Sequence, residues 1–245
     1  MSEENFKETA FVEHLKELRK RIVYIMFYLV VGAVIAWIWK EDLFNIVRAP
    51  ISPYLNKTGG GLSYTSPMES FLGYIKVALL AGTLLSAPLW IHQIWLFIAP
   101  ALYSKEKKYA LGFILSGSLL FILGAVFAYN VVFPFAFKFL LGFGDGTDQA
   151  IITIEEYLAF FTRTILIFGL AFEMPLIISV LGMMGVVNDK FLMNKRRYAF
   201  LILAIMSAVF TPPDPLSMIL MLVPLYGLYE LSIVSVKILQ PKESL

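Results

Sequence analysis

Residues 165–182 read ILIFGLAFEMPLIISVLG, an apolar run interrupted by one carboxylate, Glu173, with Pro175 two positions later. A hydrocarbon core of ~30 Å is crossed by ~20 helical residues, so this run is typical of a membrane-spanning helix. A charge near the middle of such a helix costs roughly 2.5–3.5 kcal/mol on insertion scales and is seldom incidental. We therefore expect a membrane protein in which Glu173 is functional. The alternative is a buried acid that a neighbouring serine, tyrosine or arginine satisfies.

The composition supports a membrane protein and argues against an enzyme. Hydrophobic residues make up 59% of the 245 residues, and the mean hydropathy is +0.76. The absence of cysteine excludes a disulfide framework and thiolate metal sites, and two histidines are too few for a histidine-rich metal centre. No nucleotide-binding loop, nucleophile elbow or pair of catalytic carboxylates occurs, and no basic patch with interleaved aromatics suggests nucleic acid. We expect no catalytic activity, no metal and no cofactor.

Six apolar blocks predict an all-α membrane protein with six transmembrane helices in a single integral membrane domain covering residues 1–245. The predicted spans are Ile22–Trp39, Phe71–Ala99, Tyr109–Phe133, Glu156–Gly182, Tyr198–Phe210 and Leu216–Val236. Residues 1–21 form an N-terminal amphipathic segment, residues 22–236 a six-helix bundle and residues 237–245 a tail. The fifth span is short, which predicts local thinning of the bilayer or shielded helix ends.

Prolines and capping residues mark kinks and helix starts. Pro88 lies inside the long second span and predicts a kink there. The patterns Ser66-Pro67-Met68-Glu69 and Thr153-x-x-Glu156 are capping boxes that begin spans two and four. Asp214-Pro215 offers a cap and a first residue for span six, and Ser104 can cap span three.

The distribution of basic residues predicts that both termini are cytoplasmic. With that orientation the cytoplasmic segments hold 14 Lys and Arg and the outer segments hold 4. The outer loops are then residues 40–70 and 134–155, and apolar residues such as Ile46, Tyr54, Phe135 and Phe139 predict that these loops fold back over the bundle. We expect structured outer loops and kinked helices with a concave face.

Two cytoplasmic segments carry candidate binding residues. In FVEHLKELRKRI (11–22), apolar residues recur at helical spacing, so the segment is either an amphipathic helix on the membrane surface, with Glu17 paired to Arg21, or a docking surface that uses Glu17 and Arg19. In FIAPALYSKEKK (97–108), Glu106 is the only acid. It either stabilises a helix N-terminus or presents a carboxylate to a guanidinium.

Four motifs in this order resemble the TatC family, the largest core component of the twin-arginine protein translocase. They are HLKELRKR (14–21), FIAPALYSKEKK (97–108), FEMP (172–175) and TPPDP (211–215), and the resemblance covers the whole chain. It implies a multi-pass protein of the cytoplasmic (inner) membrane that binds twin-arginine signal peptides at the cytoplasmic face. It also implies assembly with TatA- and TatB-type single-span subunits, within a complex holding further copies of this chain, to export folded proteins with the proton-motive force.

The resemblance also assigns residues. The positions that match the family's signal-recognition surface are Glu17, Arg19, Phe97, Pro100, Leu102, Tyr103 and Glu106. Glu173 matches the family's intramembrane acid, Asp214 the acid of the last outer turn, and Pro50 a frequent proline of the first outer loop. The chain departs from some relatives at Met218, where they carry a polar residue thought to meet a partner helix, and in the lysines around Glu106.

The physical chemistry of the residues agrees with a receptor. Two carboxylates on separate elements suit an arginine pair, because a guanidinium binds a carboxylate through two parallel hydrogen bonds and an ammonium does not. The competing hypothesis is a proton-coupled secondary transporter with Glu173 as proton carrier, for which Pro175 and Pro224 are the only hint of paired helix breaks.

Overall fold

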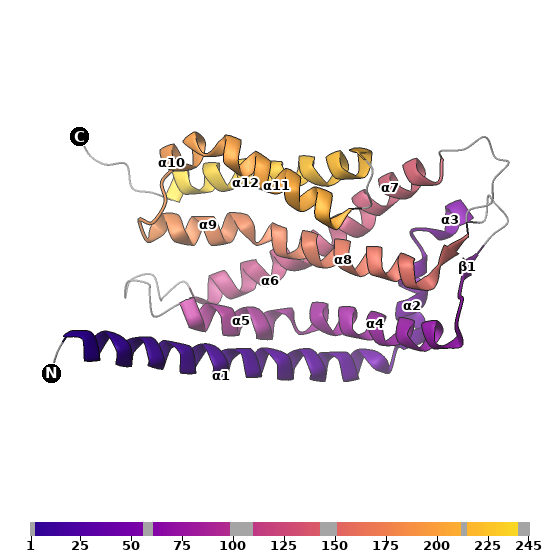
Figure 1. The fold of residues 1–245 in the computed structure, drawn as a ribbon, viewed down its shortest axis with the longest axis horizontal. Helices are drawn as coiled ribbons and strands as arrows, with labels where there is room; N and C mark the ends of the chain where they lie inside the picture. Colours follow the sequence, from indigo (N-terminus) through magenta and orange to yellow (C-terminus); the bar gives the residue numbers. More distant parts are fainter. Residues whose placement is uncertain (1–2, 56–60, 99–109, 143–150, 212–214, 240–245) are drawn as a thin grey trace.

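The computed structural model describes residues 3–55, 61–98, 110–142, 151–211 and 215–239. Its long helices lie side by side along the long axis of a bundle (Figure 1). Helix α1 begins and α12 ends at one end of this bundle, which we call the terminal end. The opposite end carries α2, α3 and β1, and we call it the loop end.

The elements follow one another along the chain as follows. They are α1 (Glu3–Trp37), α2 (Lys40–Arg48), α3 (Ser52–Leu55), β1 (Leu62–Ser63), α4 (Pro67–Leu85), α5 (Ala87–Ile98), α6 (Ala110–Phe127), the π-helical segment η4 (Ala128–Val132), α7 (Phe133–Leu140), β2 (Ile152–Thr153), α8 (Ile154–Phe172), α9 (Met174–Met183), α10 (Asp189–Asn194), α11 (Arg196–Phe210) and α12 (Pro215–Leu239).

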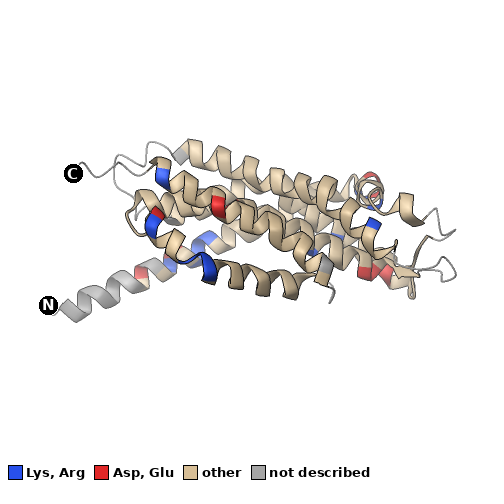
Figure 2. Ribbon diagram, turned by 90° about the horizontal axis from the view of Figure 1, so that it is seen from above, with Lys and Arg blue, Asp and Glu red and all other residues tan. Residues whose placement is uncertain are grey.

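The predicted six-span, all-α membrane fold is confirmed. Within the described residues, five helical stretches are long and apolar enough to cross a membrane: Leu15–Trp37, Pro67–Leu85, Leu111–Leu140, Ile154–Met183 and Ser217–Leu239. The remaining span, the fifth in chain order, is α11, whose 15 residues cover only about 22 Å at a rise of ~1.5 Å per residue. Helix α11 packs along α12 (Figure 1). Charged residues gather toward the two ends of the bundle, and its middle is nearly free of them (Figure 2).

Helix α1 corrects one interpretation of the N-terminal segment. It runs without a break from Glu3 to Trp37, so the segment continues the first span and does not turn to lie along the membrane surface. Neither glycine nor proline occurs in this helix before Gly32, so nothing in the backbone chemistry bends it.

The third span is longer than the sequence predicted. We expected it to end at Phe133, but the helix continues through η4 and α7 to Leu140, so Phe135 and Phe139 belong to a helix and not to an outer loop. Pro134 has no N–H to donate to the preceding turn, and it occupies the first turn of α7, directly after the wider π turn. A proline in this position redirects the helix without ending it.

Two other spans bend where the sequence places proline. Helix α4 ends at Leu85 and α5 begins at Ala87, with Pro88 in its first turn, and the Ser86 hydroxyl donates to the Gly82 carbonyl over 2.7 Å. Helix α8 ends at Phe172 and α9 begins at Met174, so Glu173 lies in the hinge. The predicted kink at Pro88 is confirmed, and Pro175 produces a second one.

The predicted caps of α4 and α8 are present. The Ser66 hydroxyl accepts from Met68 N over 3.3 Å, and the Thr153 hydroxyl accepts from Glu156 N over 3.2 Å. The carboxylate of Glu69 accepts from Thr65 N at 3.2 Å, one residue before the position that a capping box predicts. The predicted caps Ser104 and Asp214 lie outside the described residues.

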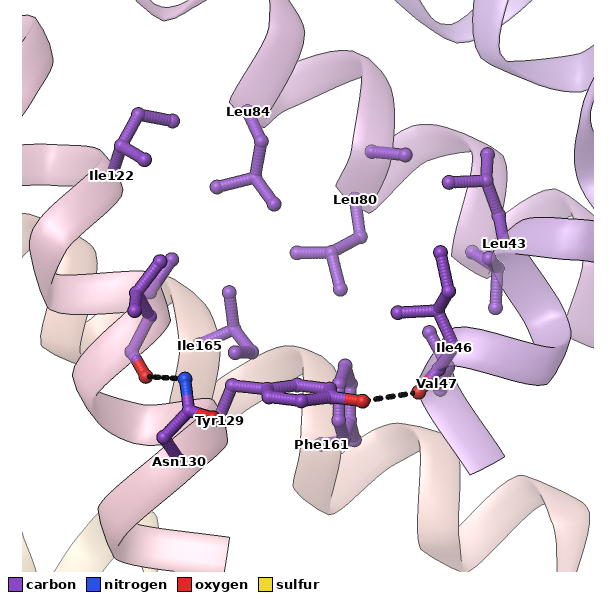
Figure 3. A pocket seen from close by; sticks show the side chains of 14 residues that line it. Leu43, Ile46, Val47, Leu80, Leu84, Ile122, Tyr129, Asn130, Phe161 and Ile165 are labelled. Atoms are coloured by element: carbon purple, nitrogen blue, oxygen red, sulfur yellow. Dashed lines mark hydrogen bonds between the residues drawn. The ribbon is translucent and has the colours of Figure 1, made fainter. Parts of the chain in front are cut away.

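The loop end is held together by one pair of short strands and by hydrogen bonds from two tyrosine hydroxyls. Strands β1 and β2 pair in parallel, with Leu62 opposite Ile152. The Tyr129 hydroxyl donates to the Ile46 carbonyl over 2.9 Å, and the Tyr157 hydroxyl donates to the Val47 carbonyl. Figure 3 shows Tyr129 reaching toward α2 across an apolar cavity of about 210 Å³. These contacts hold α2 against the bundle, so the described residues between the first two spans are structured, as predicted.

Close helix contact on the α1 side depends on glycine. A Cβ atom added at Gly82 of α4 would lie 2.3 Å from the backbone nitrogen of Ala33, and one at Gly32 would lie 2.6 Å from the Gly82 carbonyl oxygen. The α1 and α4 backbones therefore touch directly, as in membrane helix pairs built on small residues.

Candidate functional site

An arginine links the first two spans near the terminal end of the bundle. Arg21 Nη2 lies 3.1 Å from Glu17 Oε1 on the same helix, and Arg21 Nη1 donates to Gln93 Oε1 on α5 over 3.0 Å. Gln93 is buried, whereas the Glu17 side chain retains 33% of its accessible surface. The Glu17 carboxylate is thus held in place and can still accept hydrogen bonds from a further cation.

Two stacked aromatic side chains join α5 to α6. The rings of Trp95 on α5 and Phe113 on α6 lie 4.7 Å apart at 17°. These residues are near the end of α5 and the beginning of α6, the two helix ends that flank residues 99–109. The contact between Trp95 and Phe113 therefore joins these two helix ends on the same helix, α5, that carries Gln93.

Three of the predicted recognition residues, Glu17, Arg19 and Phe97, lie in the described part of the chain. Phe97 is half-buried on α5, one turn beyond Gln93. Arg19 is exposed on α1, and because residues two apart do not face each other on a helix, it lies on a different face from Glu17. The predicted residues Pro100, Leu102, Tyr103 and Glu106 lie outside the described part of the chain.

The intramembrane acid lies inside the bundle. Glu173 is only 8% exposed, and its Oε1 has no hydrogen-bond partner among the described residues. Its Oε2 lies beside α6, 3.1 Å from where a Cβ at Gly117 would be. A glycine on α6 thus makes room for the carboxylate, and a buried oxygen without a partner favours a hydrogen bond from a donor that the described residues do not supply.

The remaining predicted positions lie apart from Glu17 and Glu173. Pro50 is half-buried in the turn between α2 and α3, and Met218 is half-buried near the start of α12. Asp214 lies outside the described residues. Glu230 of α12 pairs with Arg196 of α11, with 2.6 Å between Oε2 and Nη2, and so neutralises a charge within the sixth span.

Sequence reasoning did not identify Gln93. The signal was present, since Gln93 and His92 are the only polar residues in the apolar stretch APLWIHQIWLFI of α5. A buried amide in a membrane helix needs a partner, and Arg21 in the middle of α1 is such a partner.

A comparison with known proteins identifies the family. The family model described as "Sec-independent protein translocase protein (TatC)" matches residues 13–224. The chain belongs to the TatC family. It is 40% identical over 243 residues to the TatC protein of Desulforapulum autotrophicum, covering 99% of this chain and 89% of that one. The TatC protein of Helicobacter pylori is 39% identical over 228 residues, covering 93% of this chain and 89% of that one.

A solved structure gives the same result for the fold. The crystal structure of a twin-arginine translocase receptor TatC matches with a TM-score of 0.83 at 36% identity, covering 92% of this chain and 99% of that one. The chain is therefore a multi-pass membrane component of a Sec-independent protein translocase and not an enzyme. Membership of the TatC family favours the translocase function over the alternative hypothesis of a small-molecule transporter.

Proposed function

We propose that the terminal end of the bundle binds twin-arginine signal peptides and faces the cytoplasm, in the cytoplasmic (inner) membrane. The observation that carries the proposal is the position of the Glu17 carboxylate, which Arg21 and Gln93 hold at the contact between α1 and α5. The excess of Lys and Arg in the segments assigned to that side supports the orientation, with both termini inside.

The chemistry of recognition follows from two carboxylates on separate elements. Glu17 is on α1, and Glu106 is on the segment that follows α5. Each carboxylate binds one guanidinium of the arginine pair through two parallel hydrogen bonds. Phe97 receives an apolar side chain next to the pair, while Pro100, Leu102 and Tyr103 shape the surface and Arg19 contacts the peptide backbone or an acidic residue.

Peptide binding to the detergent-purified chain tests the proposal. A fluorescent twin-arginine signal peptide and a twin-lysine control are titrated against wild type, Glu17→Ala and Glu106→Ala. Each carboxylate substitution is expected to weaken arginine-peptide binding by at least tenfold, about 1.4 kcal/mol.

Glu13→Ala is the matched control, because Glu13 is an exposed acid one turn earlier on the same helix. It should leave the affinity within twofold of wild type. Equal binding of the lysine peptide, or affinity that neither Glu17→Ala nor Glu106→Ala changes, would contradict the proposal.

We propose a second role for Glu173, as the contact for a polar side chain on the membrane helix of a TatA- or TatB-type subunit. The buried Oε1 without a described partner supports this, because a polar group on either helix is costly to bury alone. Further copies of this chain would complete the complex. The Pro50 and Asp214 turns would support the outer surface of the assembly, and the short α11 would thin the bilayer locally for the cargo.

Co-purification with a tagged single-span subunit tests the role of Glu173. Glu173→Gln retains hydrogen-bonding capacity and should keep most of the complex, whereas Glu173→Ala should lose most of it. Glu155→Ala is the control, since Glu155 is an exposed acid at the loop end that pairs with Lys76. Complex formation unchanged by Glu173→Ala would exclude this role.

A further inference from the structure

A large apolar groove lies between α12 and the continuous helix formed by α6, η4 and α7. Its volume is about 1010 Å³. The lining side chains include Phe135, which is 58% exposed, and Val223, which is 64% exposed, so no described residue covers them. Neither the signal-peptide site at the terminal end nor Glu173 is part of this lining.

The length of the groove matches one leaflet of a bilayer. On α12 the lining extends over thirteen residues, from Ile219 to Leu231, and the two end residues are about 18 Å apart along the helix at ~1.5 Å per residue. On the opposite wall it extends from Phe127 to Phe139, again thirteen residues. A hydrocarbon core is ~30 Å thick, so the groove is only a little longer than one leaflet. A transmembrane helix of a partner needs about twice that length.

The chemistry of the lining also disfavours a partner helix. Membrane helix interfaces are enriched in glycine, alanine, serine and threonine, and they use polar side chains across the contact. In this groove the only residue smaller than valine or proline is Gly227, and the only polar side chain is Lys138. The remaining lining is aliphatic or aromatic, which suits flexible acyl chains.

The single charge lies where a lipid headgroup would be. Lys138 is exposed in the last turn of α7, at the loop end of the groove, and the described residues form no ion pair with it. A lysine at the membrane surface attracts anionic phospholipid, and its long stem reaches the phosphate level.

From this geometry we propose that the groove is a binding site for one anionic phospholipid of the leaflet at the loop end. The acyl chains fill the apolar groove beside α12, and the headgroup phosphate binds Lys138. This site is independent of signal-peptide recognition.

A single labelled cysteine can report the occupant, because the chain contains no cysteine. Val223→Cys places a bromine-quenchable fluorophore inside the groove. The full chain is reconstituted in phosphatidylcholine vesicles that contain a small fraction of either brominated phosphatidylglycerol or brominated phosphatidylcholine. We expect phosphatidylglycerol to associate about fivefold more strongly, the factor that one lysine at an anionic surface supplies.

Three further variants, made in the Val223→Cys background, test which residues cause the preference for phosphatidylglycerol. Lys138→Gln should abolish it, and Lys237→Gln, an exposed lysine in the last turn of α12 at the terminal end, should leave it unchanged. Gly227→Phe should reduce quenching by both lipids, since a Cβ at Gly227 meets no atom within 4 Å and the ring can fill the groove without disturbing the helix.

Three results would overturn the proposal. Equal quenching by the two lipids, or a preference that survives Lys138→Gln, would mean that the groove selects no headgroup. Loss of lipid quenching on addition of a single-span TatA- or TatB-type subunit would mean that a partner helix occupies the groove instead.

Discussion

Arg21 Nη1 donates a hydrogen bond to Gln93 Oε1 over 3.0 Å, across 72 positions of sequence. The same guanidinium lies 3.1 Å from the Glu17 carboxylate. In the peptide-free chain, Arg21 therefore makes with Glu17 the kind of contact that an arginine of a signal peptide would make. In the proposed binding mode, an incoming arginine has to share Glu17 with Arg21 or displace it.

Arg21→Gln is expected to tighten binding of the twin-arginine peptide by up to about fivefold. Partly exposed ion pairs contribute about 0.2–1 kcal/mol. Without the Arg21 guanidinium, the peptide no longer has to break its ion pair with Glu17, so the free energy of peptide binding becomes more favourable by that amount. Fluorescence titration of the labelled peptide measures the change.

Lys20→Gln removes the same charge from the neighbouring exposed position and should alter affinity less than Arg21→Gln does. Weaker peptide binding in Arg21→Gln would show that Arg21 positions the Glu17 carboxylate and does not compete for it.

Gly82→Ala should separate α1 from α4. The new methyl group would lie 2.3 Å from the backbone nitrogen of Ala33, and a backbone atom cannot move away as a side chain can. Overpacking of this kind costs about 1–3 kcal/mol, so thermal unfolding in detergent should begin at a clearly lower temperature.

Gly112→Ala is the matched control, because a Cβ at that position of α6 meets no atom within 4 Å and alanine favours the helix. Its unfolding temperature should equal or exceed that of wild type. Equal unfolding temperatures for Gly82→Ala and wild type would mean that α1 and α4 do not pack as closely as described.

Tyr129→Phe should loosen α2 without unfolding the bundle. The substitution removes the hydrogen bond to the Ile46 carbonyl, which is worth about 1 kcal/mol, and leaves the ring in place against Phe161. Hydrogen exchange of the α2 amides should accelerate by up to about fivefold, while exchange in α8 stays unchanged.

Tyr157→Phe should have the larger effect, because Tyr157 is buried and its loss leaves the Val47 carbonyl without that donor. Tyr24→Phe, on the exposed surface of α1, controls for loss of a hydroxyl. Unchanged α2 exchange in Tyr129→Phe and Tyr157→Phe would mean that apolar packing alone holds α2.

Thr153→Ala should destabilise the start of α8 by about 1 kcal/mol, because the hydroxyl that accepts from Glu156 N caps the helix. Unfolding in detergent measures the loss. Thr83→Ala is the control, since the Thr83 hydroxyl donates back to the Leu79 carbonyl within α4 and caps nothing. Equal stability of the two variants would show that the cap does not contribute.

The sequence by itself determined the class of the protein, the six spans and most of their breaks. Apolar length, Pro88, Pro175 and the caps at Ser66 and Thr153 act through neighbours within a few residues, so their effects can be predicted from local pattern. The pairing of Glu17 with Arg21 is of the same kind, since residues four apart share a helix face.

Only the tertiary structure decided which side chains meet across helices. The contacts of Arg21 with Gln93, Glu173 with Gly117 and Glu230 with Arg196 join residues 34 or more positions apart. These contacts depend on the rotation of each helix about its axis and on its depth in the bundle. The apolar pattern of the sequence predicts neither, because side chains that face lipid and side chains that face the core are equally hydrophobic. The continuation of the third span beyond Pro134 was also decided by tertiary structure. The proline is compatible with either a loop or a π turn, and the packing of Phe133 against Phe161 favours the helix.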